Sequence, residues 1–190
     1  MNPAPIDVGR DQPIRRWLLP DERILWEGRP DVSAYSLRGS WYLIPFSLLW
    51  GGFAIFWEAT AIASHAPPFF LIWGVPFVLV GLYMIFGRIF VARREARNTT
   101  YAITDRRILI SSGVFRPSFT ALELRNLPGA KVDEGKGGTG SITFGATTGF
   151  QMPPGWPTMG VMYARTPAFV AIPDVRRVFD TYEKARTASV

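Results

Sequence analysis

Two long apolar runs separated by a short polar break constrain this chain more than any other feature of its sequence. Residues 41–57 and 66–87 contain no charged side chain, and Glu58 and His65 lie between the runs. A bilayer core of roughly 30 Å needs about 20 apolar residues in a helix. The alternative, two core helices of a soluble protein, leaves roughly 100 residues after the second run, too few to bury both. The sequence therefore predicts a two-helix transmembrane hairpin.

The distribution of Lys and Arg predicts the orientation of this hairpin. Arginines flank it on both sides, whereas the predicted loop 58–66 has neither Lys nor Arg. The flanking residues are Arg10, Arg15, Arg16, Arg23, Arg29 and Arg38 before the hairpin, and Arg88, Arg93, Arg94 and Arg97 after it. Because segments rich in Lys and Arg stay on the cytoplasmic side, we expect a multi-pass membrane protein with both termini in the cytoplasm.

The composition excludes several classes of site. The chain has no cysteine and one histidine, which excludes disulfides, thiol nucleophiles and most metal sites. The net charge is +6, but about half of the basic residues are the flanking arginines, and an anionic membrane surface accounts for them. We therefore expect the lipid bilayer as a partner, no nucleic acid, no metal and no cofactor.

Beyond the second run the pattern changes from helical to extended. Short stretches rich in β-branched and aromatic residues predict strands at 101–104, 107–112, 114–124, 141–145 and 169–172. Asp105 and Arg106 lie in the turn between the first two of these strands. Residues 133–140 predict a Gly-rich turn, and 174–186 predict a helix with an apolar stripe along one side.

These patterns predict three parts of the chain: an N-terminal cytoplasmic segment at 1–40, the transmembrane hairpin at 41–90 and a folded cytoplasmic domain at 98–187. In the first part, residues 13–19 predict a short helix. This helix lies either on the membrane surface or against the protein's own domain. Residues 24–26 are apolar between charges and predict a short strand or anchor.

Four motifs, taken in this order, are similar to those of a known family. They are ERILWEGRP at 22–30, YAITDRR at 101–107, GTG at 138–140 before ITF at 142–144, and a closing PD at 173–174. Over residues 21–185 the chain resembles the membrane-anchored bacterial pleckstrin-homology (PH) proteins. The resemblance implies an α+β domain on the cytoplasmic side of a bacterial inner membrane. Its fold would be a PH-like β-sandwich or barrel with a C-terminal α-helix.

The resemblance does not imply phosphoinositide binding. The lipid-binding eukaryotic members of the family have a long basic loop between their first two strands. At this place we expect only the short turn formed by Asp105 and Arg106.

Two groups of residues are candidates for contact with the membrane or a partner. Arg93, Arg94 and Arg97 fall on one edge of the helix that leaves the membrane. The uncharged segment 152–162 carries apolar side chains, and those singled out are Met152, Trp156 and Met159. The alternative is that this segment folds back onto the sheet. A Trp156→Ala variant distinguishes the two: it should weaken binding if the segment is a contact, and should lower stability if the segment packs on the sheet.

No residue pattern predicts catalysis. Residues 135–140 match G-x-G-x-x-G, but they precede a strand and open no helix, as dinucleotide binding requires. The acids of the predicted domain are scattered and form no acid/base pair.

We therefore expect a non-catalytic protein that presents the PH-like domain as an interaction or assembly module. Two alternatives stay open: a lipid-sensing or lipid-binding accessory protein, and an enzyme with an unrecognised site. The protein partner and homo-oligomerisation are also left open.

Overall fold

The computed structural model describes residues 14–37, 40–113, 117–145 and 166–189. The described chain forms two compact units. One unit, called the PH-like unit below, consists of residues 14–32 together with the described residues from 96 onward. The other unit, the helical unit, covers the described part of 33–95.

The first sheet of the PH-like unit contains four antiparallel strands in the order β1-β2-β3-β4. Their bounds are β1 Ile24–Gly28, β2 Thr100–Thr104, β3 Arg107–Ser112 and β4 Ser118–Glu123. β2 is buried along its whole length, because it lies in the middle of the sheet and is covered on both faces. β4 is an edge strand with a more exposed pattern.

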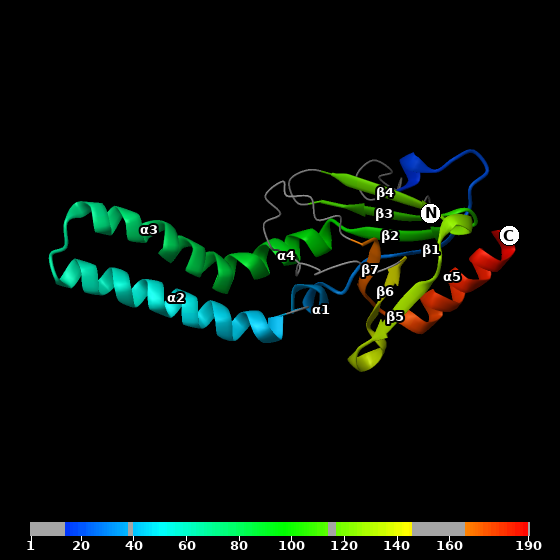
Figure 1. Ribbon diagram of the computed structural model, residues 1–190. Helices are drawn as coiled ribbons and strands as arrows, with labels where there is room; N and C mark the ends of the chain where they lie inside the picture. The colour runs from blue at the N-terminus through cyan, green and yellow to red at the C-terminus, as the bar shows by residue number, and fades with distance from the viewer. Residues whose placement is uncertain (1–13, 38–39, 114–116, 146–165, 190) are drawn as a thin grey trace, which may run out of the picture. The chain divides into compact units, whose positions relative to one another are not determined.

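The second sheet contains three antiparallel strands in the order β5-β6-β7, and a long helix closes the unit (Figure 1). The strands are β5 Ala130–Glu134, β6 Gly140–Phe144 and β7 Ala168–Ile172, and the helix is α5 Val175–Ser189. Two 3-10 turns, η3 Leu124–Asn126 and η4 Lys136–Gly138, flank β5. The core joins side chains of both sheets to the apolar stripe of α5, where Val175, Val178 and Tyr182 are buried. Two apolar helices, these two sheets and a terminal helix together fit the PH-like fold.

Strand β1 comes from before the apolar runs, which changes the predicted domain boundary. β1 pairs with β2 from Ile24↔Thr104 to Gly28↔Tyr101. The first sheet is therefore assembled across more than 70 residues of intervening chain, and a domain starting at 98 lacks its first strand. The reason is that strand pairing depends on contacts distant in sequence, which local periodicity does not reveal.

The same finding corrects the strand count on which the lipid argument rested. Asp105 and Arg106 form the turn between β2 and β3, not between the first two strands. The connection between the first two strands is the whole segment 29–99. The shortness of the Asp105–Arg106 turn therefore carries no argument against lipid binding.

The segment before β1, residues 14–23, lies across the first sheet, and we call it the strap. It contains the 3-10 turn η1 Arg15–Trp17. Ile14 is fully buried against Ala102 and Leu109, with Leu18 packed beside them. The Trp17 ring stacks on Phe119 of β4, with 4.9 Å between ring centroids. Of the two predicted positions for this segment, the structure has the one against the protein's own domain.

The helical unit contains α1 Val32–Leu37, α2 Ser40–Ala63 and α3 Pro68–Leu82. A π-helical turn, Tyr83–Gly87, joins α3 to α4 Arg88–Arg97. Two stretches, Ile44–Ala63 and Pro68–Arg97, are long and apolar enough to cross a membrane. This agrees in position with the two predicted apolar helices.

Glu58 lies inside α2 and not in the loop predicted at 58–66. The residues that follow it, Ala59–Ala63 in sequence, are compatible with a helix, so α2 continues until the Ser64–Pro67 turn. Pro68 then starts α3 at a position that favours proline. The loop between the apolar helices is therefore shorter than predicted, and α2 contains one ionisable residue. The Glu58 carboxylate packs against Gly74 of α3, where a Cβ atom would collide with it.

Small side chains let α2 and α3 approach closely. Ser47, Gly51, Ala54 and Ala61 are buried along one side of α2, at spacings of four, three and seven residues that keep to one face of a helix. On α3, a Cβ atom added to Gly81 would lie 2.8 Å from the Cα of Gly51. The large apolar side chains therefore lie on the outer faces of the two helices.

Candidate functional site

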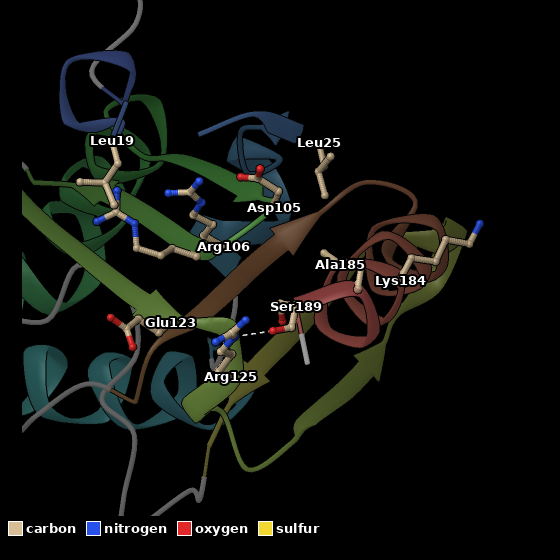
Figure 2. A pocket seen from close by; sticks show the side chains of 11 residues that line it. Leu19, Leu25, Asp105, Arg106, Glu123, Arg125, Lys184, Ala185 and Ser189 are labelled. Carbon is tan, nitrogen blue, oxygen red and sulfur yellow. Dashed lines mark hydrogen bonds between the residues drawn. The ribbon is translucent and has the colours of Figure 1, made fainter. Parts of the chain in front are cut away.

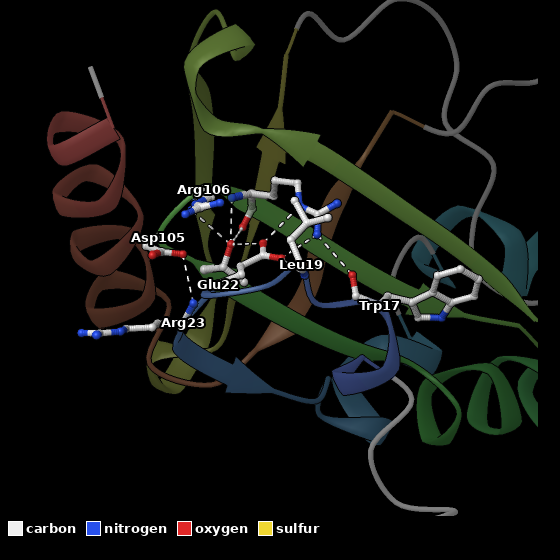
Figure 3. Close-up of polar contacts among 8 residues, drawn as sticks. Trp17, Leu19, Glu22, Arg23, Asp105 and Arg106 are labelled. Atoms are coloured by element: carbon white, nitrogen blue, oxygen red, sulfur yellow. Dashed lines mark hydrogen bonds and ion pairs between the residues drawn. The ribbon is translucent and has the colours of Figure 1, made fainter.

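A buried ion pair fixes the strap to the turn between β2 and β3 (Figure 3). One oxygen of the Glu22 carboxylate accepts a hydrogen bond from Nη2 of Arg107 at 2.6 Å, and the other accepts one from Nε of Arg107 at 3.1 Å. The Glu22 side chain is fully buried, and that of Arg107 is 16% exposed. A bidentate pair of this kind is among the stronger hydrogen-bonded contacts in proteins.

Three further groups complete this network. The backbone N–H of Leu19 donates to Glu22 Oε2 at 2.8 Å, and the Thr104 hydroxyl donates to Glu22 Oε1 at 2.8 Å. Arg107 Nη2 also donates to the carbonyl oxygen of Trp17. Both oxygens of Glu22 are thus occupied by partners within the protein, which satisfies a buried charge that would otherwise be costly.

The network lowers the pKa of Glu22 below its ordinary value. Burial by itself raises this pKa, but the hydrogen bonds from Arg107, from the Leu19 N–H and from Thr104 outweigh burial. Glu22 in turn raises the pKa of Arg107. The carboxylate is therefore held in its ionised form while it joins the strap to β3.

A pocket of about 840 Å³ opens next to this network, at the end of the sheet formed by the β2–β3 turn (Figure 2). Leu19 of the strap and Leu25 of β1 supply apolar surface, and Ala185 and Ala188 of α5 supply more. The polar lining consists of Asp105, Arg106, Arg107, Glu123, Arg125, Lys184 and Ser189. The pocket thus combines aliphatic surface with charged side chains, most of which are cations.

The charged side chains of the pocket differ in the partners that they have within the protein. Arg107 is paired with Glu22. The carboxylate of Asp105 accepts the backbone N–H of Arg23 at 3.1 Å, and that of Glu123 accepts the side-chain amide of Asn126 at 2.8 Å. The cations Arg106, Arg125 and Lys184 take part in none of the ion pairs found among the described residues.

The structure places only some of the predicted contact residues. Arg93, Arg94 and Arg97 are all exposed on α4, whereas Ala92 and Ala96 on the same helix are buried. The three arginines therefore share the predicted basic edge. Met152, Trp156 and Met159 lie outside the described residues.

The Gly-rich segment at 135–140 connects two antiparallel strands, β5 and β6, and includes η4. It does not lead from a strand into a long helix, which agrees with its interpretation as a connection. In the described part of the chain, no group of three or more His, Asp or Glu side chains is placed to hold a metal ion.

Sequence reasoning missed both the Glu22–Arg107 pair and the pocket. The two partners of the pair are 85 positions apart, and no local pattern connects them. A signal was nevertheless present, because Glu22 opens the ERILWEGRP motif and Arg107 closes the YAITDRR motif. Two motifs of one family that are distant in sequence are candidates for direct contact.

Comparison with known proteins agrees with this architecture. Residues 52–186 match the family model described as bacterial PH domain. The chain is also 27% identical over 186 residues to the "uncharacterized 23.7 kDa protein in puhA 5' region" of Rhodobacter capsulatus, covering 89% of this chain and 81% of that protein. No solved structure matches the chain. Because the family model matches more than half of the chain, this protein belongs to the bacterial PH domain family.

Proposed function

We propose that this protein is a multi-pass protein of the bacterial inner membrane whose PH-like unit acts in the cytoplasm as a non-catalytic interaction or assembly module. The observation that carries the proposal is the insertion of the apolar helices between β1 and β2. Two adjacent strands of one sheet continue into the helices, so the domain is attached to them through two chain segments. Such a double attachment suits a domain that must stay at the membrane.

The outer surfaces of α2 and α3 support the membrane part of the proposal. Leu49 is 74% exposed, Ile72 72% and Phe56 70%, and many other large apolar side chains of these helices are exposed. In water this amount of contiguous apolar surface would cause aggregation, whereas hydrocarbon solvates it. Glu58 packs against Gly74 of α3 and so faces the neighbouring helix, as ionisable residues inside membrane helices usually do.

The use of the polar residues supports a non-catalytic role. General acid/base catalysis needs a carboxylate or imidazole that is free to exchange a proton with a substrate. The most buried carboxylate of the PH-like unit, Glu22, has both oxygens bonded to the protein itself. The pocket beside it presents mainly cations and aliphatic side chains, which suit recognition.

Reporter fusions test the proposed topology. Ten arginines flank the helices, and the Ser64–Pro67 turn contains neither Lys nor Arg, so both termini should stay in the cytoplasm. A C-terminal green fluorescent protein should fluoresce and a C-terminal alkaline phosphatase should be inactive, while phosphatase inserted in the turn should be active. The opposite pattern would contradict the topology, and fluorescence in the soluble fraction would contradict membrane insertion.

A second candidate, a lipid-binding accessory protein, is favoured by the exposed basic edge of α4. Arg93, Arg94 and Arg97 lie in the connection between the first two strands, and each cation near an anionic leaflet contributes about 1 kcal/mol. Salt-sensitive binding to anionic vesicles that is lost when the three arginines are replaced by glutamine would favour this candidate over a protein-binding module.

A further inference from the structure

Exposed large apolar side chains are concentrated in one region of the PH-like unit. Among its described residues, those with a large hydrophobic side chain that is exposed are Trp17, Leu19 and Leu25, at 50%, 46% and 49%. Leu19 and Leu25 both line the pocket beside the Glu22–Arg107 pair. Exposed apolar surface on an otherwise well-covered domain marks an interaction site.

Cations from three separate elements line the same pocket. Arg106 comes from the β2–β3 turn, Arg125 from η3 and Lys184 from α5 (Figure 2). Their charges are not neutralised by an ion pair among the described residues. Arg125 donates to the carbonyl oxygen of Ser189, and the two carboxylates of the lining accept hydrogen bonds from neutral groups. Beside the paired Arg107, the lining holds three cations and two carboxylates. The pocket therefore favours a ligand that carries negative charge beside an apolar group.

The pocket lies at the end of β2 opposite to the end at which the chain enters the first sheet from the apolar helices. The chain leaves the first sheet after Gly28 and returns at Thr100, and these two ends are neighbours in the β1–β2 pairing. The Asp105–Arg106 turn lies at the other end of β2. Since β2 is five residues long, the two ends of this strand are roughly 16 Å apart.

We infer that this pocket docks an acidic peptide segment of a partner protein, with an aliphatic or aromatic side chain seated against Leu19 and Leu25 and carboxylates paired with Arg106, Arg125 and Lys184. The inference rests on the proposed function, since it gives the interaction module a binding surface and a class of ligand. Apolar anchors surrounded by charges that select the partner are the usual organisation of such interfaces.

The test uses the full-length protein in phosphatidylcholine nanodiscs and a phage-displayed library of random peptides as the probe. The pocket variant is Arg106→Glu/Lys184→Glu, and the matched control is Lys131→Glu/Arg177→Glu, which reverses one lysine and one arginine at exposed positions outside the pocket. Thermal unfolding of each variant verifies that it is folded.

Selected peptides should combine Asp or Glu with large apolar residues, and should bind the wild type and the control equally. Their affinity for the pocket variant should fall at least about tenfold and should weaken with added salt. Enrichment of peptides without acids, equal binding to the pocket variant, or no enrichment would overturn the inference. Pocket-dependent binding to phosphatidylglycerol vesicles without any peptide enrichment would overturn it in favour of a lipid surface.

Purification from native membranes separates this inference from the proposed function. If partner proteins stay bound to the pocket variant as well as to the control, the module stands and this docking surface is wrong. If no protein co-purifies with the wild type under mild conditions and no peptide is enriched, both the module and the surface are wrong.

Discussion

Replacing Glu22 by alanine should lower the unfolding free energy of the PH-like unit by about 3–5 kcal/mol. The substitution leaves Arg107, whose side chain is 16% exposed, without its partner. It also leaves the Thr104 hydroxyl and the Leu19 N–H without the acceptor they share. Since a domain of this size is stable by only about 5–15 kcal/mol, urea unfolding followed by circular dichroism should show a large shift.

Two comparison variants separate the buried pair from a general loss of charge. Glu27 lies exposed in β1, and Glu27→Ala should change stability by no more than about 0.5 kcal/mol. The double variant Glu22→Met/Arg107→Met should be more stable than either single variant, because it removes both buried charges together. Equal stability of Glu22→Ala and Glu27→Ala would contradict the role given to the network.

The same residue gives the unit a defined pH dependence. The folded-state pKa of Glu22 lies below its unfolded value. The unfolded state therefore binds the proton more readily, and the stability contributed by Glu22 is fully present above the ordinary carboxyl pKa of about 4.3. It is lost as the pH falls through the lower folded-state pKa. Unfolding measured between pH 6 and pH 3 should show this loss in the wild type, and Glu22→Gln should reduce the slope.

A fragment that begins at Asn98 should show no cooperative unfolding. Without residues 14–28, β2 loses its partner on one side, and the core loses the Trp26 ring that packs on Phe169 at 5.6 Å. The fragment also leaves Arg107 without Glu22. These losses together exceed the usual stability of a small domain, so its tryptophan and circular dichroism signals should change gradually with urea.

A fused variant provides the matched control for this fragment. Joining residue 31 to residue 98 through a short Gly/Ser linker restores β1 beside β2, because Gly28 and Tyr101 are already paired neighbours. Connections of a few residues are common between adjacent antiparallel strands. The fused chain should be soluble and should unfold cooperatively. If the fragment and the fused chain unfold alike, β1 contributes little to the domain.

The sequence predicts those elements whose pattern is local. The apolar runs, the strands at 101–104 and 107–112 and the terminal helix all follow from period or composition, and all are present in the structure. β5 was missed, since its residues Ala130–Glu134 are partly charged and were assigned in part to the Gly-rich turn. β5 is an edge strand in which no residue is fully buried, so its residues carry a weaker apolar signal.

The candidate site is less predictable, because it depends on long-range pairing. Arg93, Arg94 and Arg97 could be placed on one edge from helical geometry alone, and the structure exposes all three. The pocket required knowing that β1 joins β2, since only this pairing brings Leu25 beside Arg106 and Lys184. The family motifs that contain these two strands can be found in the sequence, but the contact between the motifs cannot.

A disulfide between β1 and β2 in the full-length protein tests most directly whether one sheet is assembled across the apolar helices. Glu27 and Ala102 are register partners, and neighbouring antiparallel Cα atoms are about 4.5–5.5 Å apart, within disulfide range. The chain contains no cysteine, so Glu27→Cys/Ala102→Cys introduces the only pair. A protease site in the Ser64–Pro67 turn then allows the chain to be cut between the two cysteines. After oxidation and cleavage, the two halves should remain joined on a non-reducing denaturing gel and should separate on reduction, whereas halves that separate without reductant would contradict the split PH-like domain.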